Sequence, residues 1–430
     1  MNYEKALEYL SSLAKFGSQP GLSRIEKLLD IMDHPERNYR TIHVTGTNGK
    51  GSTTAFLTAI LKAAGIRSGM FTSPHLVDYT ERIVVDGEQI TGLDFGRAIE
   101  HTRLCVAEMV AYGGDHPTEF EILTAAAFYH FAVAQVEYAV IEVGMGGLLD
   151  STNVIIPQVS VITNVSLEHT DKCGSTIAEI AAHKAGIIKP HVPVVTAAQG
   201  EALNIIYNQS EKLYSPLFVI NRDFSVQWKG EKRDWQYLTV RSNQYGNVTN
   251  LRTKLLGRHQ TENCACAVVS AQILASEDDR ITPESIRHGI ESTVWPGRFE
   301  FISSSPIVIV DGAHNPAGAE ILRTALDHQY PGKQITFVFG ALADKDIAGM
   351  IQMLFRPEDR VVAVAPQSDR AADAWALLSQ LPVSQAEASP TVEQAIDMAE
   401  EWAGEGGIVC ICGSLYLIGH ARKIVLNRCK

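Results

Sequence analysis

Short apolar runs typical of β-strands alternate with longer segments of helical periodicity through the first half of the chain. The runs at residues 41–45, 138–143, 158–163 and 192–196 are separated from one another by helix-like segments. This alternation predicts a parallel sheet with helices on both faces, because neighbouring parallel strands need a crossover connection. We therefore expect a doubly wound α/β fold.

A second α/β alternation follows residue 298. The segment TVWPGR at 293–298 predicts a linker, because Pro-Gly interrupts both helical and strand patterns. The strand-like runs PIVIVDGAHNP, QITFVFGAL, RVVAVAP and GGIVCICGS then recur between helix-like stretches. A chain of 430 residues is long enough for two or three domains. We predict a larger domain with a phosphate-binding loop over residues 1–295 and a smaller Rossmann-like domain over residues 298–430.

Residues 217–257 interrupt the α/β alternation. The runs VQWKG and DWQYLTV alternate polar and apolar residues around charged turn residues. They predict a small antiparallel hairpin attached to the first sheet.

Residues 41–54, TIHVTGTNGKGSTT, pass from a β run through a glycine-rich loop into a helix. The glycines allow a tight turn, the helix start adds its positive dipole end, and Lys50 adds a point charge. Val44 and Gly51 depart from the pattern G-x-x-x-x-G-K-[ST]. The alternative is a glycine-rich turn that binds nothing. The lysine at the helix start favours a polyphosphate, so we expect ATP or GTP here.

Polar residues collect where the expected strands of the first domain end. In open parallel sheets, ligands bind beyond the carboxyl ends of the strands. A carboxylate, a hydroxyl and an imidazole beside a polyphosphate suit a Mg²⁺ site completed by water. Each residue alone is more often structural, so their shared location carries the prediction. The residues are Ser73, His75, Glu142, Asn164, Glu168, His169 and Asp171.

Two further groups have competing interpretations. Lys184 lies in the helix-like segment AEIAAHKAGII, and its own surroundings favour a surface lysine whose stem lies along the helix. Asp311 and His314 follow a strand of the second domain, and Arg298 lies in the linker before it. This arginine is suited to a nucleotide phosphate. The alternative is a loop-stabilising aspartate followed by the capping residue Asn315.

Composition excludes several classes of protein. A net charge of −12 without any basic block argues against nucleic-acid binding. The first 17 residues predict an amphipathic helix rather than a secretion signal, and no run approaches the roughly 18 apolar residues of a membrane span. We expect a cytoplasmic protein. The seven cysteines, including two C-x-C pairs at 264/266 and 410/412, predict buried free thiols rather than a metal site.

The chain resembles folylpolyglutamate synthases and the related bifunctional dihydrofolate synthases, which are Mur-ligase-like ATP-dependent amide ligases. The resemblance covers residues 20–423, and its motifs occur in the family's order. They are TGTNGKGS, FTSPHL with a following ERI, EVGMGGLLDSTN, the EHTD run ending at residue 171, HKAGIIKP, GRHQTEN, WPGRFE, DGAHNP and GSLYLIG.

The resemblance implies that ATP is the nucleotide and that two Mg²⁺ ions bind. The implied metal ligands are Ser73, Glu142 and His169, with Lys184 carbamylated by CO₂ and helping to hold the second ion. This carbamate replaces the surface-lysine interpretation. The implied nucleotide-binding residues are Gly46, Thr47, Asn48, Gly49, Lys50, Gly51, Ser52, Asn263, Arg298 and Asp311.

The resemblance also implies a substrate side and a catalytic set. His314 and Ser414 would face the incoming glutamate, and Lys50, Lys184 and His314 form the implied catalytic set. The implied substrate-binding residues are Arg24, His75, Phe120, Asp150, Asn153, His314 and Ser414. Two positions depart from the family pattern: Leu148 stands where an arginine is usual, and His183 where a glutamate is usual.

The predicted activity is ATP-dependent addition of L-glutamate to reduced folates, building a γ-linked polyglutamate tail through an acyl phosphate. Dihydropteroate is an alternative acceptor. One rival is a cell-wall Mur ligase, but only 45 residues precede Gly46, too few for the sugar-nucleotide domain of those enzymes. Another is a non-catalytic ATP-binding switch, which would not need Asp311, His314 and Arg298. The predicted partners are small molecules, without nucleic acid or membrane, and the predicted oligomeric state is a monomer.

Overall fold

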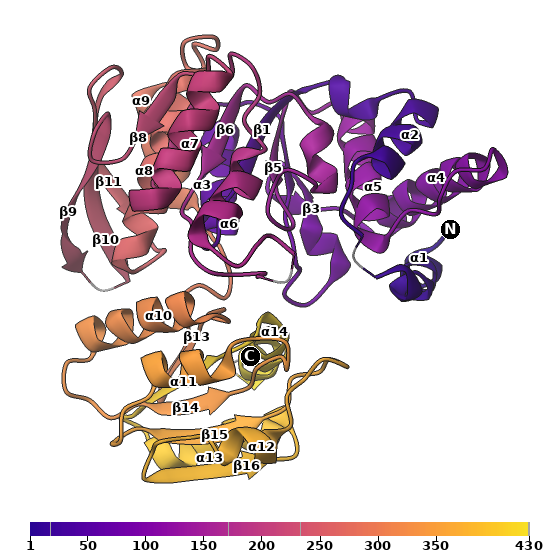
Figure 1. The fold of residues 1–430 in the computed structure, drawn as a ribbon. Helices are drawn as coiled ribbons and strands as arrows, with labels where there is room; N and C mark the ends of the chain where they lie inside the picture. Colours follow the sequence, from indigo (N-terminus) through magenta and orange to yellow (C-terminus); the bar gives the residue numbers. More distant parts are fainter. Residues whose placement is uncertain (18, 171, 233, 429–430) are drawn as a thin grey trace. The chain divides into compact units, whose positions relative to one another are not determined.

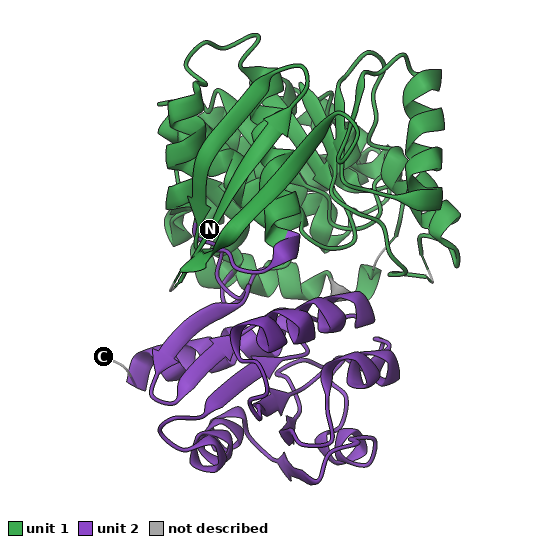
Figure 2. Ribbon diagram, turned by 90° about the vertical axis from the view of Figure 1, so that its left-hand side faces the viewer, with its two compact units in different colours: residues 1–74, 79–254, 260–293 green, residues 75–78, 255–259, 294–430 purple. Residues whose placement is uncertain are grey.

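The computed structural model describes residues 1–17, 19–170, 172–232 and 234–428 (Figure 1). The chain divides into two compact units, coloured in Figure 2. Unit 1 comprises Met1–Pro74, Tyr79–Lys254 and Gln260–Thr293. Unit 2 comprises His75–Asp78, Leu255–His259 and Val294–Lys430. Two short segments that precede residue 295 therefore pack with unit 2.

Unit 1 is built around an eight-stranded sheet in the order β4-β3-β2-β5-β1-β6-β7-β8. Strands β2, β5, β1, β6, β7 and β8 are parallel, and β3 and β4 add an antiparallel edge. The central strands are continuous apolar runs because both of their faces are covered. The strands are β1 Arg40–Thr45, β2 Ser68–Phe71, β3 Ile83–Val85, β4 Glu88–Gln89, β5 Tyr138–Glu142, β6 Val159–Ile162, β7 Val194–Thr196 and β8 Leu217–Val219.

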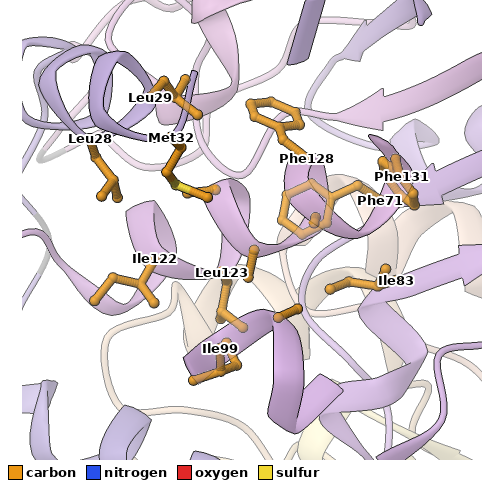
Figure 3. Close-up of a cluster of buried hydrophobic side chains, with 14 of the residues drawn as sticks. Leu28, Leu29, Met32, Phe71, Ile83, Ile99, Ile122, Leu123, Phe128 and Phe131 are labelled. Atoms are coloured by element: carbon orange, nitrogen blue, oxygen red, sulfur yellow. The ribbon is translucent and has the colours of Figure 1, made fainter. Parts of the chain in front are cut away.

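Helices cover both faces of this sheet. Ala139 and Ile141 of β5 join an apolar cluster with the helices α1, α2, α4 and α5. Figure 3 shows part of this cluster, including Leu28 of α2, Ile99 of α4 and Phe128 of α5. Val140 points to the opposite face and is also fully buried, and α3 packs against β1, β2 and β5. The helices of this part are α1 Tyr3–Ser12, α2 Ser23–Ile31, α3 Lys50–Ala63, α4 Gly92–Ala111, α5 Glu119–Val133, α6 Ile177–Ala185 and α7 Gly200–Lys212.

The antiparallel addition differs from the prediction. Instead of a hairpin attached to the main sheet, β9 Phe224–Lys232, β10 Trp235–Ser242 and β11 Gly246–Thr253 form a separate three-stranded sheet in the order β11-β10-β9. The sequence before Phe224 makes a turn, so only β8 extends the parallel sheet. Helices α8 Arg258–Leu274 and α9 Pro283–Ser292 follow, and α9 packs against α3 and β11.

Unit 2 contains a six-stranded sheet in the order β12-β13-β17-β14-β15-β16, with β12 antiparallel to its neighbour. Alternate strand residues enter two different apolar clusters, one shared with α10, α11 and α12 and the other with α13 and α14. The predicted two-domain α/β fold class is thus confirmed. The elements are β12 Glu300–Ser304, β13 Ile307–Val310, α10 Pro316–Gln329, β14 Thr336–Phe339, α11 Ile347–Leu354, β15 Arg360–Val364, α12 Ala374–Leu378, β16 Gln385–Ser389, α13 Val392–Ala403, β17 Ile408–Cys412 and α14 Leu415–Arg428.

The structure also tests the expectations for cysteines and membrane spans. The six cysteines that it describes are buried free thiols, as predicted, and Cys429 lies outside the described residues. Within the described parts of the chain, no helix has the length and apolar character needed to cross a bilayer.

Candidate active site

The loop after β1 owes its shape to glycine. Gly46 and Gly49 have φ values of 155° and 85°, which residues other than glycine rarely adopt. A Cβ on Gly46 would overlap the hydroxyl of Thr163, and a Cβ on Gly49 would overlap the amide of Asn263. The loop leads directly into the N-terminus of α3. Its main-chain amides and the helix dipole therefore form a turn suited to an anion.

The segment after β6 supports this loop. The Asn48 main-chain N–H donates to Asn164 Oδ1 at 2.9 Å, and Asn164 Nδ2 donates back to the Asn48 carbonyl at 2.9 Å. The Thr47 hydroxyl donates to the Ser166 carbonyl at 3.1 Å. Asn164 was expected at a strand end, but its contacts with the phosphate loop were not predicted. Its position directly after β6, the strand that pairs with β1, could have indicated these contacts.

Lys50 lies over its own loop. Its Nζ donates to the carbonyls of Gly46 and Thr47, both at 3.0 Å. Gly51 and Ser52 are buried in the first turn of α3. Asn263 Nδ2 donates to Gln260 Oε1 at 3.0 Å, which fixes its amide beside Gly49. The loop residues, Lys50 and Asn263 are therefore brought together in unit 1.

Glu142 and Ser73 meet at the same edge of the sheet. Glu142 ends β5 and pairs in register with Val44 of β1. Ser73 follows β2, and its main-chain N–H donates to Glu142 Oε2 at 3.3 Å. The Glu142 side chain is buried. Parallel strand order thus places a carboxylate and a hydroxyl residue next to the start of the phosphate loop.

This pair fits a Mg²⁺ that also binds phosphate. Mg²⁺ commonly takes one or two carboxylates together with water and phosphate oxygens. In the described part of the chain, no group of three or more His, Cys, Asp or Glu side chains is arranged to hold a metal. His169 lies next to Glu168, with 4.0 Å between Nε2 and Oε1. Asp171 lies outside the described residues. A metal at Glu142 and Ser73 would share its coordination with the nucleotide.

Lys184 is buried in unit 1 with 4% of its surface exposed, so its interpretation as a surface lysine is wrong. Burial, reinforced by the charge of Lys50, lowers the pKa of the Lys184 ammonium to about 7. Glu168 and Cys173 act in the opposite direction. Lys184 and Lys50 therefore share one electrostatic environment, and a large fraction of the Lys184 amine is neutral near pH 7.

The glycine turn after β5 packs against the end of α6, where Lys184 lies. A Cβ on Gly147 would approach the His183 carbonyl oxygen to 2.8 Å. The Leu148 main-chain N–H donates to the same carbonyl at 2.8 Å. The two departures from the family pattern, Leu148 and His183, are therefore direct neighbours. This contact could not be foreseen from their separation in sequence.

Two residues predicted for the folate side lie at the start of α2 and α5. Arg24 Nε donates to Glu121 Oε2 at 3.1 Å, and both side chains are largely buried. Phe120 stacks with Phe71, with 6.0 Å between ring centroids. Arg24 and Phe120 therefore belong to adjoining segments, and Arg24 already has a carboxylate partner.

Asp150 and Asn153 hold the chain that follows the glycine turn. Asp150 accepts the Met145 main-chain N–H at 2.8 Å and the Thr152 hydroxyl at 2.5 Å. Burial raises the pKa of the Asp150 carboxyl, and these hydrogen bonds oppose the shift. Asn153 Nδ2 donates to the carbonyls of Leu148 and Gly186. Both residues therefore have structural contacts, and their roles in substrate binding stay predictions.

Unit 2 contains the remaining predicted residues: Asp311 and His314 follow β13, Ser414 follows β17, and Arg298 precedes β12. Asp311 accepts the main-chain N–H groups of Phe299 and Ala313, both at 2.8 Å. Burial raises the pKa of its carboxyl, while Arg298 and His314 act in the opposite direction. His314 Nδ1 lies 2.7 Å from the Gly312 carbonyl.

Ser414 and His75 also lie in unit 2. Ser414 is buried after β17, and the preceding residue, Gly413, donates its N–H to the Ala313 carbonyl at 3.1 Å. This bond brings Ser414 near His314 in the fold. His75 packs with unit 2, although Ser73, two residues earlier in the chain, belongs to unit 1. The predicted site residues thus form one set in each unit.

The fold and the phosphate loop define a nucleotide-dependent ligase of the Mur ligase type. The Mur ligase middle domain matches residues 44–271, and the Mur ligase glutamate ligase domain matches residues 297–415. A curated dihydrofolate synthase/folylpolyglutamate synthase from Bacillus subtilis is 36% identical over 424 residues, covering 98% of each chain. A folylpolyglutamate synthase from Lacticaseibacillus casei is 39% identical over 357 residues, covering 82% of this chain and 83% of that protein.

Solved structures agree with these relatives. Folylpolyglutamate synthase from Mycobacterium tuberculosis, complexed with ADP and AMPPCP, superposes with a TM-score of 0.91 at 32% identity, covering 99% of both chains. The chain belongs to the folylpolyglutamate synthase/dihydrofolate synthase family.

Proposed function

We propose that this protein is an ATP-dependent ligase that joins the amine of L-glutamate to the terminal carboxylate of a folate, with release of ADP and phosphate. The observation that carries the proposal is the phosphate loop with Lys50, Glu142 and Lys184 around it, in a chain that matches both Mur ligase domains. The relatives named as folylpolyglutamate or dihydrofolate synthases supply the substrate class.

The reaction needs an activated carboxylate, because a carboxylate oxygen is a poor leaving group. Transfer of the γ-phosphoryl group from ATP to this oxygen forms an acyl phosphate. The glutamate amine then attacks the acyl carbon, loses a proton, and the C–O bond to phosphate breaks. The chain has to align these groups and neutralise phosphate charge, for which the loop amides and Lys50 are placed.

Mg²⁺ would be held by Ser73, Glu142 and His169, and would supply charge neutralisation on the phosphates. We further propose that Lys184 reacts with CO₂ through its neutral amine to give a carbamate, releasing a proton. Its burial and lowered pKa favour the neutral amine that this reaction requires. The carbamate would convert a buried cation into an anion suited to a second Mg²⁺.

Unit 2 supplies the proposed glutamate side. Asp311, Arg298 and His314 are electrostatically coupled, and Ser414 lies at the neighbouring strand end. We assign Arg298 and Asp311 to the nucleotide and His314 and Ser414 to the incoming glutamate. These roles, the predicted monomer and the cytoplasmic location remain parts of the proposal.

Steady-state assays with labelled L-glutamate test the proposed reaction. We expect ADP release to require both tetrahydrofolate and L-glutamate, in a one-to-one ratio with label incorporated into the folate. A parallel assay with dihydropteroate decides whether the first glutamate is also added, since the Bacillus subtilis relative carries both names. Rapid ATP hydrolysis with neither acceptor nor glutamate, or incorporation without any folate, would contradict the proposal.

A further inference from the structure

A groove on unit 2 shares only His75 with the predicted site residues described so far. It encloses a volume of about 470 Å³. One wall is the segment 75–77, and another is the part of α14 that includes Tyr416, His420, Lys423 and Asn427. We call it the α14 groove. Most of its lining residues are polar, so it suits a hydrophilic ligand rather than an apolar one.

The wall formed by residues 75–77 is fixed by a close main-chain contact. A Cβ on Gly419 of α14 would overlap the Leu76 carbonyl oxygen and lie 2.8 Å from the carbonyl carbon. The Leu76 side chain packs against the apolar cluster beneath α13 and α14. Its methyl groups also lie 3.5 Å from the Cβ position of Gly297. The groove is therefore formed before any ligand binds.

The α14 wall presents donors for anions. His420, Lys423 and Asn427 follow one another at helical spacings of three and four, which places them on one face. Among the described residues, Lys423 Nζ has no hydrogen-bond or ion-pair partner. His420 Nδ1 is buried without a hydrogen bond, and its Nε2 lies 3.5 Å from Glu393 Oε1. Glu393, the acid among the lining residues, thus lies beside His420 and makes no ion pair with Lys423, which leaves Lys423 for a ligand carboxylate.

The ends of the groove are close in sequence to predicted site residues. Tyr416 follows Ser414 by two residues, and His75 follows Ser73 by two. From Tyr416 the α14 wall extends about 16 Å to Asn427, at 1.5 Å per residue. A γ-linked glutamyl residue spans about 6 Å of covalent chain. The groove therefore has the length of two to three such residues.

We infer that the α14 groove binds internal γ-glutamyl residues of a lengthening folate tail, through their free α-carboxylates at Lys423. This inference rests on the proposed function. Each round of ligation must bring a new terminal carboxylate to the same phosphate, while the pterin end remains bound. The added residues between these two ends need a place away from the direct path. A preformed, hydrophilic groove with an unpaired cation meets this need.

The test compares mono-, di- and triglutamyl tetrahydrofolates as acceptors for the wild type and for Lys423→Ala. In Lys423→Ala, we expect the KM for the triglutamate to rise about five- to tenfold, because one exposed charge-assisted contact with a ligand carboxylate is lost. The KM for the monoglutamate and kcat should change less than about twofold. The products should also be shorter. Lys423 is exposed, so the variant should fold, and its melting temperature should match that of the wild type.

Lys333→Ala is the matched control, because Lys333 is an exposed lysine of the same unit outside the groove. This variant should leave KM and kcat unchanged for every acceptor. If Lys423→Ala raised the KM equally for all three acceptors, or left the KM for the triglutamate unchanged, the inference would be overturned. Failure of the wild type to extend the monoglutamate would instead refute the proposed function, so the two failures are distinguishable.

Discussion

At the scale of single residues, Lys184 shows how strongly position in the fold changes a side chain's chemistry. Its sequence neighbours suggest a helix surface, yet it is buried near Lys50, and burial lowers its pKa to about 7. Burial of the Lys184 ammonium is costly although the Glu168 charge partly offsets it, and conversion to a metal-bound carbamate would remove the buried cation. This makes Lys184 the residue with the most specific chemical prediction.

We expect Lys184→Ala to lower kcat at least about 100-fold, because a ligand that stabilises transferring charge would be lost. The KM for L-glutamate should change much less. Wild-type protein equilibrated with ¹³C-bicarbonate should show a carbamate carbonyl signal by NMR that Lys184→Ala lacks. Lys212→Ala, at an exposed lysine of α7 in the same unit, is the control and should keep both the activity and the signal. A fully active Lys184→Ala variant, or the same carbamate signal in it, would refute the carbamate.

At the scale of elements, α14 contains a glycine whose role is close packing. Gly419 is helical, and alanine there would gain up to about 1 kcal/mol of helix propensity. The overlap with the Leu76 carbonyl should outweigh this gain, because main-chain atoms cannot move aside cheaply. We expect Gly419→Ala to lower the free energy of unfolding by about 1–3 kcal/mol.

Urea unfolding of purified protein measures this effect. Gly92→Ala at the first turn of α4 is the control, because its Cβ would meet Tyr3 at an ordinary contact distance of 3.4 Å. The control should stay within about 0.5 kcal/mol of the wild type. A Gly419→Ala variant as stable as the control would show that Leu76 does not pack closely on α14.

The sequence predicted those elements whose local pattern was strong. The central strands of both sheets were recognisable because burial on both faces leaves uninterrupted apolar runs, as in β5 and β17. Their shared topology also predicted that Ser73 and Glu142 would meet. The strands β9–β11 were predicted as a hairpin attached to the main sheet, but they form a separate sheet. Their own residue patterns do not show which sheet they join, because this depends on the turn before Phe224.

Other features depended on contacts between distant segments. The α2 helix that carries Arg24 was not predicted, and its pairing with Glu121 joins residues 97 positions apart. Helix α5 begins at Glu119 because the side chains of Thr118 and Glu121 form a capping box there. The neighbouring positions of Leu148 and His183 likewise arise only when the glycine turn meets α6. Such tertiary contacts leave no local periodic signal.

At the scale of the whole molecule, two units of one ligase divide the proposed chemistry between them. Unit 1 carries the phosphate loop, Glu142 and Lys184, and unit 2 carries Asp311, His314 and Ser414. A loop that only binds phosphate would require no more than the first set, whereas joining glutamate requires His314 and Ser414 of the second. The proposed reaction requires that phosphate pass to a folate carboxylate before glutamate is joined. An oxygen atom of that carboxylate must then leave with phosphate.

Isotope transfer measures this step directly. Tetrahydrofolate labelled with ¹⁸O in its γ-carboxylate is incubated with the protein, ATP, Mg²⁺ and L-glutamate, and the released phosphate is analysed by mass spectrometry. We predict one ¹⁸O atom in each phosphate released, with one labelled oxygen retained in the new amide. Amide formation with released phosphate that carries no ¹⁸O, the lost carboxylate oxygen appearing in water instead, would contradict the acyl phosphate and the proposed ligase reaction.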